Sequence, residues 1–464
     1  STLFLEPEVE SMRLNRVLIT APKSGSGKTL VTCGLLGILK KRGIRTASFK
    51  CGPDFIDPMF HSRVLGAKSR NLDPFFTDPD TTRMLLAKNG ADCEMAVMEG
   101  VMGYYDGLSE TSSRGGASDL AAVTGTPVLL VADASGSSRS LLALIKGFLD
   151  FQKVPLIQGV ILNRISPMLY PRMKKVIEEE LHVKVAGYVP VLKDCVLESR
   201  HLGLMLPEEV DSLKEKMELL SSRLEETLEL ETIFAIAREA EQLPEPGYPE
   251  SGTAGAGLRI GLARDEAFCF FYEDNLSFLR EQGTELVEFS PLHDRKLPEG
   301  LSGLLLHGGY PELHVRELSE NVSMRESIRR AVEGGLPCMA ECGGFLYLHE
   351  TMTDMEGKEY PMAGVIRGKA WNNGRLTRFG YITLSGGKVF GRETGDIRSH
   401  EFHYFDTEDP GSDFLAEKPS GNRSWRCIHS RENLFAGFPH LYYYANTKLP
   451  LAFLDACRER KGPC

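Results

Sequence analysis

A glycine-rich loop follows the first apolar run of the chain. Residues 21–29 read Ala-Pro-Lys-Ser-Gly-Ser-Gly-Lys-Thr, after an expected strand at 16–20 and before an apolar helical run. Glycines let a backbone wrap around phosphate oxygens, while the loop amides and the helix N-terminus face the anion. Lys28 would contact the terminal phosphates, and Thr29 would supply a hydroxyl to Mg²⁺. We predict an ATP site made by Lys23, Ser24, Gly25, Ser26, Gly27, Lys28 and Thr29.

The match to the phosphate-loop consensus is partial, because Pro22 stands where the consensus has glycine. A glycine-rich turn with an exposed lysine is the alternative interpretation. Asn163, which ends the expected strand 158–163, could read an adenine edge or simply terminate the strand. We assign it to the ATP site.

Acidic residues follow two later strands of the same region. Asp54 and Asp57 lie just past an expected strand at 46–49, and Glu99 ends another at 95–99. Ligands in open α/β sheets gather outside the carboxyl ends of the strands, and Mg²⁺ prefers oxygen ligands. We therefore predict a magnesium site from Thr29, Asp54 and Glu99. Asp57 could equally cap a turn.

A second constellation surrounds a cysteine. Residues 336–344, LPCMAECGG, predict a short buried strand that ends in a sharp turn before a helix. Such an elbow presents a nucleophile beside backbone amides that can bind an oxyanion. Cys342 is the candidate nucleophile, and we expect the helix N-terminus to lower its pKa. The oxyanion candidates are Gly308, Gly309 and Gly344, whereas Cys338 is more typical of a core thiol.

A cysteine nucleophile needs a base, which is normally histidine. Four histidines follow in the C-terminal part of the chain: His400, His403, His429 and His440. Spacing cannot choose between them, because such partners are neighbours in space rather than in sequence.

Composition limits the remaining possibilities. The 464 residues carry a net charge of −10, and the ten cysteines show no zinc-type spacing. A nucleic-acid binder would normally have a basic excess, so we expect no nucleic-acid partner. No run of 18 apolar residues occurs and the N-terminus lacks a signal peptide pattern, so we expect a cytoplasmic protein without a membrane partner.

Two α/β rhythms divide the chain. Short apolar runs alternate with helical stretches in the first half, which predicts a parallel sheet covered by helices. Residues 208–241 predict acidic helices, and a stretch rich in Pro and Gly follows before the rhythm resumes. We predict a domain at 1–245, a linker at 246–257 and a second domain at 258–464.

Eight ordered motifs resemble the cobyrinic acid a,c-diamide synthases over essentially residues 14–460. They are TAPKSGSGKT, CGPDFIDPMFH, NLDPF, MEGVMGYYDG, GGYPEL, AECGGFLYL, SHEFHYF and FPHLYYYAN. The resemblance implies a phosphate-loop amidoligase domain similar to dethiobiotin synthetase, joined to a glutaminase domain of the class I type.

The same resemblance implies the reaction and its partners. Glutamine would give its amide nitrogen through a thioester on Cys342, and ATP would activate a substrate carboxylate as an acyl phosphate. Ammonia would then displace phosphate, amidating the a- and c-acetate side chains of cobyrinic acid in cobalamin biosynthesis. A homodimer is the assembly that the class suggests.

By matching motifs, the resemblance implies that His440 is the base. Class I glutaminases usually carry Glu two residues after this histidine, and Tyr442 stands there instead. We expect a Cys–His dyad or a third partner from elsewhere in the chain, with His403 as the alternative base.

A substrate with several carboxylates calls for cations in the groove. Lys50, Arg70, Arg114 and Arg139 lie beside the motifs, although each could instead be a solvated surface charge. Asp57, His61 and Asp106 complete the substrate-site candidates.

Three alternatives stay open. Hydrogenobyrinic acid, Ni-sirohydrochlorin or a related tetrapyrrole could be the acceptor. The phosphate loop alone would permit a regulatory ATPase, and a degenerate glutaminase would use free ammonia.

Overall fold

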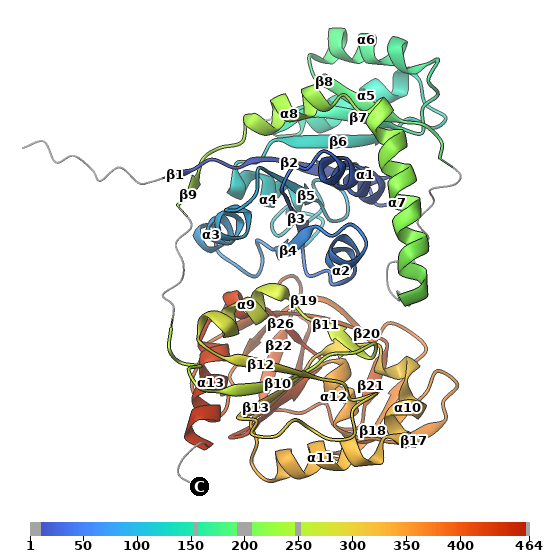
Figure 1. Ribbon diagram of the computed structural model, residues 1–464. Helices are drawn as coiled ribbons and strands as arrows, with labels where there is room; N and C mark the ends of the chain where they lie inside the picture. The colour runs from blue at the N-terminus through green and yellow to red at the C-terminus, as the bar shows by residue number, and fades with distance from the viewer. Residues whose placement is uncertain (1–10, 153–155, 193–206, 246–251, 461–464) are drawn as a thin grey trace, which may run out of the picture. The chain divides into compact units, whose positions relative to one another are not determined.

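The computed structural model of the protein describes residues 11–152, 156–192, 207–245 and 252–460. The chain divides into two compact units, Ser1–Tyr248 and Pro249–Cys464 (Figure 1). Of the predicted linker, residues 246–251 lie outside the described residues, and 252–257 form a turn before the first strand of the second unit.

The N-terminal unit is built on one seven-stranded sheet in which every pairing is parallel. Across the sheet the strands are β4 (Lys68–Leu72), β3 (Thr46–Cys51), β5 (Met95–Glu99), β2 (Asn15–Thr20), β6 (Val128–Asp133), β7 (Ile157–Asn163) and β8 (Lys184–Val189). The central strands are almost wholly buried, because helices cover both faces. The predicted parallel α/β architecture is confirmed.

Helices form the outer layers of this unit (blue to green in Figure 1). One face packs against α1 (Lys28–Lys41), α2 (Ile56–Arg63), α7 (Pro207–Thr227) and α8 (Leu230–Arg238). The opposite face packs against α5 (Arg139–Asp150) and α6 (Tyr170–Leu181). Two further helices, α3 (Pro79–Gly90) and α4 (Ala117–Thr124), contact each other.

Close packing fixes the helix that follows the glycine-rich loop. A Cβ on Gly34 would overlap the side chain of Leu224, and one on Gly37 would overlap that of Ser221. The two glycines therefore let α7 lie directly on α1. At the ends of the unit, β1 (Ser11–Met12) pairs with β9 (Leu243–Pro244). Beside this pair, buried Arg16 donates to the carbonyls of Thr124 and Glu241.

The C-terminal unit has a six-stranded main sheet with the order β12 (Glu285–Phe289), β10 (Arg259–Ala263), β13 (Gly303–Leu306), β15 (Cys338–Glu341), β25 (Leu434–Gly437) and β24 (His429–Arg431). All pairings are parallel except β24 with β25. One face packs against α10 (Val315–Glu320), α11 (Val322–Glu333) and α12 (Gly343–Tyr347). Phe453 of α13 (Lys448–Arg460) packs beside Gly303 on the other face, and α9 (Glu273–Glu281) contacts β12.

Between α12 and β25 the chain is mostly β-structure, which the sequence analysis did not anticipate. A four-stranded sheet contains β17 (Glu359–Pro361), β16 (His349–Thr353), β18 (Ile366–Asn372) and β21 (Phe405–Thr407). An antiparallel five-stranded sheet contains β23 (Ser424–Cys427), β22 (Phe414–Glu417), β19 (Arg378–Ser385), β20 (Ile397–His403) and β26 (His440–Leu441). The β20–β26 pairing sets His400 opposite His440.

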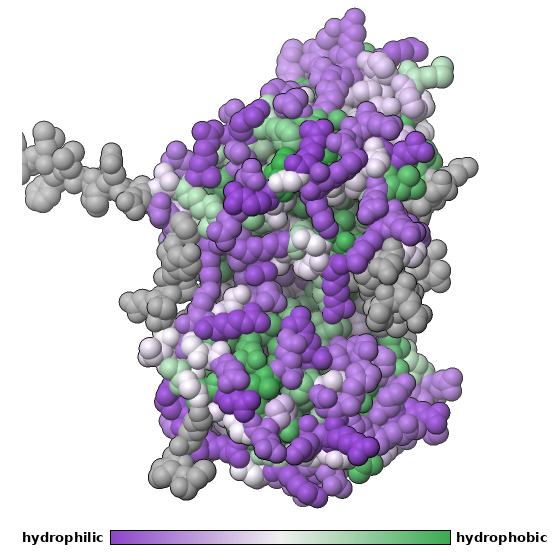
Figure 2. Space-filling view, viewed as in Figure 1, coloured by the Kyte–Doolittle hydropathy of each residue, from purple (hydrophilic) through white to green (hydrophobic). Residues whose placement is uncertain are grey.

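Hydrophilic side chains predominate on the face shown in Figure 2, where hydrophobic ones stand in small groups. Within the described ranges, no helix combines the length and apolar character that a bilayer crossing requires.

Candidate functional site

The glycine-rich loop connects β2 to α1, as predicted. Gly25 and Gly27 have φ values of 79° and 103°, in the left-handed region that glycine adopts without a Cβ penalty. A Cβ on Gly27 would overlap the side chain of Asn163, which comes from the end of β7. Asn163 Nδ2 donates to the Ser26 carbonyl at 2.8 Å, and its Oδ1 accepts from the Arg164 amide at 2.9 Å. Asn163 therefore braces the loop through Nδ2, while the bond from the Arg164 amide to Oδ1 fixes the orientation of its side chain.

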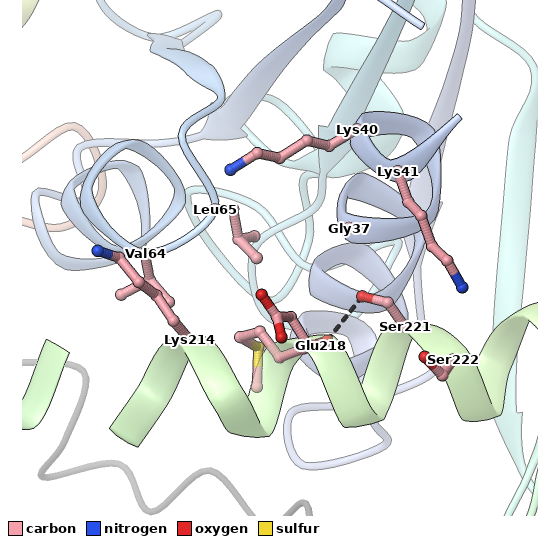
Figure 3. Close-up of a pocket in the computed structure, with 10 residues that line it drawn as sticks. Gly37, Lys40, Lys41, Val64, Leu65, Lys214, Glu218, Ser221 and Ser222 are labelled. Atoms are coloured by element: carbon pink, nitrogen blue, oxygen red, sulfur yellow. Dashed lines mark hydrogen bonds between the residues drawn. The ribbon is translucent and has the colours of Figure 1, made fainter. Parts of the chain in front are cut away.

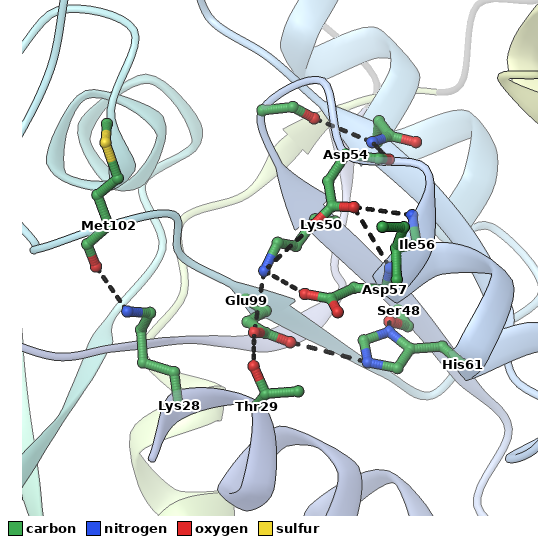
Figure 4. Close-up of polar contacts among 12 residues, drawn as sticks. Lys28, Thr29, Ser48, Lys50, Asp54, Ile56, Asp57, His61, Glu99 and Met102 are labelled. Carbon is green, nitrogen blue, oxygen red and sulfur yellow. Dashed lines mark hydrogen bonds and ion pairs between the residues drawn. The ribbon is translucent and has the colours of Figure 1, made fainter. Parts of the chain in front are cut away.

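Lys28 lies at the start of α1 and is largely buried. Its Nζ donates to the Met102 carbonyl at 2.6 Å (Figure 4). Burial and the nearby Lys50 ammonium lower the pKa of Lys28. Asp106 contributes to the field around this lysine, and its Oδ2 accepts from the Gly103 amide at 2.8 Å.

A buried cluster of charges lies next to the loop (Figure 4). Lys50 Nζ lies 2.6 Å from Asp57 Oδ2, 2.9 Å from Glu99 Oε1 and 3.9 Å from Asp54 Oδ2. Burial alone would lower the pKa of Lys50, but the carboxylates of Glu99 and Asp57 outweigh it and raise that pKa well above its ordinary value. Burial and Asp57 raise the pKa of Asp54 to about 6.

The register of the sheet explains why the cluster forms. Lys50 and Glu99 are direct partners on the parallel strands β3 and β5. Asp54 accepts the backbone amides of Ile56 and Asp57, and so shapes the turn into α2. The cluster thus joins residues from two strand ends and one turn.

The side-chain oxygens beside the loop are of the type that binds a hard cation. Thr29 Oγ1 donates to Glu99 Oε1 at 2.7 Å, while Glu99 Oε2 is buried and accepts no hydrogen bond from the described residues. Magnesium takes few protein oxygens and completes its shell with phosphate and water. No group of three or more His, Cys, Asp or Glu side chains in the described ranges has an arrangement that could hold a metal by itself. Of the predicted magnesium ligands, Thr29 and Glu99 are in hydrogen-bond contact, and Lys50 Nζ lies within 3.9 Å of both Asp54 and Glu99.

His61 reaches the same cluster from α2. Its Nδ1 shares a 2.8 Å hydrogen bond with Ser48 Oγ, and its Nε2 lies 3.7 Å from Glu99 Oε2. Burial lowers the pKa of His61 to about 4, so the ring is neutral at pH 7.

The other predicted substrate residues lie in different surroundings. Arg139 forms a two-point ion pair with Glu180 of α6, at 3.0 and 2.9 Å. Arg114 is exposed in a turn. Of the predicted ATP residues, Lys23 and Ser24 are exposed in the glycine-rich loop. Arg70 lies on β4, where its Nη1 donates to the Ser69 carbonyl at 2.9 Å. The structure gathers Lys50, Asp57 and His61 into the charge cluster but places Arg139 in a surface pair.

A sharp turn carries the candidate nucleophile of the C-terminal unit. β15 ends at Glu341, and Cys342 has φ 45° and ψ −102° before α12 begins at Gly343. Residues other than glycine rarely adopt this backbone conformation, which is typical of strained turns at functional sites. The Cys342 amide donates to the Gly437 carbonyl at 2.8 Å, and this bond ties the turn to the neighbouring strand.

Burial and the carboxylate of Glu312 raise the pKa of the Cys342 thiol. The amide of Gly343, the first residue of α12, acts to lower this pKa as expected. Burial and the carboxylates of Glu312 and Glu401 outweigh it, so the pKa is raised and not lowered.

Gly308 marks the point where Cys342 and His440 converge. A Cβ on Gly308 would lie 2.8 Å from His440 Cε1 and 3.5 Å from Cys342 Cβ. A Cβ on Gly309 would overlap the Ala267 carbonyl, and one on Gly344 would overlap the Leu306 carbonyl. The backbone of all three glycines therefore approaches its neighbours more closely than any other residue allows.

The alternative base, His403, is engaged elsewhere. Its ring stacks on Phe438 with centroids 3.7 Å apart, and its Nδ1 bonds the Phe405 carbonyl at 2.6 Å. His429 bonds the Asp409 carbonyl at 2.9 Å. Of the four candidate histidines, His440 is the one whose ring lies beside the point shared with Cys342.

Two buried polar residues that the sequence did not single out lie beside Cys342 and His440. Glu341 is 3% exposed and His307 is 2% exposed, at the ends of β15 and β13. The sequence does contain a sign of Glu341, because a carboxylate that ends the apolar run LPCMAE needs a polar partner inside the protein. At the position usually held by Glu in class I glutaminases, Tyr442 donates its hydroxyl to Asp274 at 2.8 Å.

A cavity of about 480 Å³ lies between α1, the end of α2 and α7 (Figure 3). Its lining combines apolar Val64, Leu65 and Met217 with the ammonium groups of Lys40, Lys41 and Lys214. Lys40 and Lys41 end the helix that starts at Lys28, so this cavity lies about 18 Å along the helix axis from the phosphate loop. It contains none of the predicted site residues.

Comparisons with known proteins match a different family model to each of the two units. Residues 17–203 match the CobQ/CobB/MinD/ParA nucleotide binding domain, and residues 259–447 match the CobB/CobQ-like glutamine amidotransferase domain. A relative named cobyrinate a,c-diamide synthase from Listeria innocua is 38% identical over 96% of this chain and 99% of its own length.

Two further relatives carry the same name. The one from Caldanaerobacter subterraneus is 37% identical over 95% of this chain and 98% of its own length. The one from Salmonella typhimurium is 36% identical over 96% of this chain and 99% of its own length. With a phosphate loop in one unit, a cysteine elbow in the other and this similarity along nearly the whole chain, the protein belongs to the cobyrinate a,c-diamide synthase family.

Proposed function

We propose that this protein uses ATP and glutamine to amidate the a- and c-acetate carboxylates of cobyrinic acid in cobalamin biosynthesis. The observation that carries the proposal is the pairing, in one chain, of a phosphate loop beside buried carboxylates with a Cys–His elbow. Residues 1–245 act as the amidoligase domain and residues 258–464 as the glutaminase domain.

Glutamine hydrolysis is assigned to the C-terminal unit. The sulfur of Cys342 attacks the amide carbon, and the oxyanion that forms is bound by amides near Gly308, Gly309 and Gly344. His440 accepts the thiol proton and delivers it to the leaving ammonia. Water then cleaves the glutamyl thioester, which releases glutamate and restores the thiol.

Activation of the carboxylate is assigned to the N-terminal unit. A carboxylate oxygen of the corrinoid attacks the γ-phosphorus of ATP, and ADP leaves, which gives an acyl phosphate. Lys28 and the loop amides bind the phosphate oxygens. Magnesium, held by Thr29, Asp54 and Glu99, would neutralise negative charge on the phosphates. Ammonia then replaces phosphate at the acyl carbon, which gives the amide.

Lys50 is assigned to the substrate site. Its buried ammonium is already ion-paired with Asp57 and Glu99 and therefore holds these two carboxylates in place. His61, Arg70, Asp106 and Arg114 are assigned to the surrounding groove. For Arg139 the ion pair with Glu180 argues for a surface role instead. Neither site calls for a nucleic-acid or membrane partner, and we assign the protein to the cytoplasm as a homodimer.

A mass-spectrometric assay with ATP, Mg²⁺ and glutamine tests the reaction. It compares cobyrinic acid, hydrogenobyrinic acid and Ni-sirohydrochlorin as acceptors. We expect two successive exchanges of hydroxyl for amino groups on cobyrinic acid. A faster reaction with another acceptor would replace the substrate assignment, and ATP hydrolysis that never depends on glutamine or a corrinoid would favour a regulatory ATPase.

Replacing Lys28 tests the phosphate loop. We expect K28A to slow amidation by about 10²-fold or more, because a fixed cation at the transferring phosphoryl group is lost. Glutamine hydrolysis measured as glutamate release should persist. The matched control is K40A, at the other end of α1, which should leave amidation unchanged. Equal loss of both activities in K28A would contradict the assignment of separate sites.

Replacing Cys342 tests the nucleophile. We expect C342S to reduce glutamine-dependent amidation by about 10³-fold or more, because the hydroxyl is a far weaker nucleophile than the thiol. Amidation with ammonium chloride should be unaffected. Buried Cys338, on the same strand, provides the control C338A, which should keep its glutamine dependence. Unaltered glutamine use by C342S would refute the assignment.

Replacing Glu99 tests the magnesium site. We expect E99Q to raise the Mg²⁺ concentration for half-maximal ATP turnover about tenfold or more, because a charged oxygen ligand becomes a neutral one. The control is E94Q, an exposed glutamate just before the same strand. An unchanged Mg²⁺ dependence in E99Q would remove this residue from the metal site.

A further inference from the structure

Glu341 is a buried carboxylate next to the nucleophile. It is the last residue of β15, it precedes Cys342 directly, and it is 3% exposed. The rest of that strand, Cys338–Ala340, packs into the apolar core. A carboxylate is costly to bury unless opposite charges or donors surround it. Its position therefore calls for specific partners.

Those partners are two imidazoles and one backbone amide. Glu341 Oε2 accepts from the Leu441 amide at 3.2 Å and lies 3.8 Å from His440 Nδ1. Glu341 Oε1 lies 3.8 Å from His307 Nδ1 and accepts no hydrogen bond from the residues that the structure describes. The carboxylate thus lies between His307 and His440, and the Leu441 bond fixes its orientation.

Two other buried carboxylates of this unit face different groups. Asp274 accepts the hydroxyl of Tyr442 at 2.8 Å. Glu401 lies 3.6 Å from His403 Nε2, on a ring that is already stacked on Phe438 and bonded through Nδ1. Neither Asp274 nor Glu401 faces the ring of His440 in these contacts, whereas Glu341 lies 3.8 Å from its Nδ1.

We propose that Glu341 is the positioning residue of the glutaminase site, holding His440 through Nδ1 so that Nε2 exchanges the proton with Cys342. The proposal rests on the glutaminase function proposed above. Glu341 supplies, from the strand that ends at the nucleophile, the acidic partner that Tyr442 cannot supply two residues after the histidine.

The chemistry needs such a partner for two reasons. A carboxylate on Nδ1–H selects the tautomer whose Nε2 can accept a proton, and it stabilises the imidazolium that then forms. The other groups facing His440 act in the opposite direction. Burial, His400, His403 and His307 all lower the pKa of His440. The negative charge of Glu341 opposes that effect at the moment when the ring becomes charged.

Protons balance without any change at the carboxylate. The thiol proton moves from Cys342 Sγ to His440 Nε2 as the C–S bond forms, and then to the nitrogen of the leaving ammonia as the C–N bond breaks. Glu341 takes no part in this proton transfer, so it acts on His440 rather than on the substrate.

The test is the kinetics of glutamine hydrolysis by E341Q and E341D in the full-length protein, followed as glutamate release with ATP and cobyrinic acid present. We expect E341Q to lower kcat by about 10²-fold or more, as when the carboxylate partner of a catalytic histidine is made neutral. The KM for glutamine should stay near that of the wild type, and amidation with ammonium chloride should be unchanged. E341D, which keeps the charge, should recover part of kcat.

Two further variants serve as references. D274N removes the charge of a buried carboxylate that faces Tyr442, and it should keep the wild-type kcat. E401Q removes the charge near His403. A collapse of kcat in E401Q together with a normal kcat in E341Q would overturn the proposal.

The remaining outcomes are also decisive. A normal kcat in E341Q, or a rise in KM that accounts for the whole loss, would overturn the proposal. If E341Q does not fold, E341D decides, because a lowered kcat at unchanged KM supports it and an unchanged kcat opposes it. Wild-type protein that releases no glutamate would instead refute the proposed function itself.

Discussion

Both candidate sites depend on one constraint, which is that the strands of a parallel sheet all end at the same edge. In the N-terminal unit the ends of β2, β3, β5 and β7 bring the phosphate loop, Lys50, Glu99 and Asn163 together. In the C-terminal unit the ends of β13, β15 and β25 surround Cys342. Residues far apart in the chain become neighbours because strand register, rather than chain distance, determines what meets at that edge.

Charges buried at these edges compensate one another inside the protein. Lys50 is surrounded by Asp57, Glu99 and Asp54, and its pKa rises although burial alone would lower it. Glu341 has polar partners instead of an opposite charge, because it lies between the rings of His307 and His440 and accepts the Leu441 amide. At low effective dielectric an unpartnered charge would be costly, so each group restricts where its partners can lie. Such mutual restriction suits sites that must hold reacting atoms in fixed positions.

Backbone geometry imposes the second restriction. The left-handed turns at Gly25 and Gly27 shape the loop, and the strained conformation of Cys342 presents its sulfur at the elbow. Gly308 leaves room for the ring of His440 and for Cys342 at the same point. A side chain at Gly27 or Gly308 would therefore displace Asn163 or His440. In both units, glycines let side chains from other parts of the chain come into contact with the backbone of the site.

The amino-acid sequence by itself determined the two α/β units, the phosphate loop and the cysteine elbow, because backbone conformation there depends on a few consecutive residues. It also pointed to the family through motifs that stand in a fixed order. Tertiary structure decided what depends on register and packing: His440 rather than His403 beside Gly308, Asn163 bracing the loop, and Arg139 in an ion pair. The position of Glu341 beside His440 also required it, since the two residues are 99 positions apart in the sequence and are brought together by the β15–β25 pairing and the Leu441 amide. Local patterns encode turns and helices, whereas the partner of a buried charge is chosen by the fold around it.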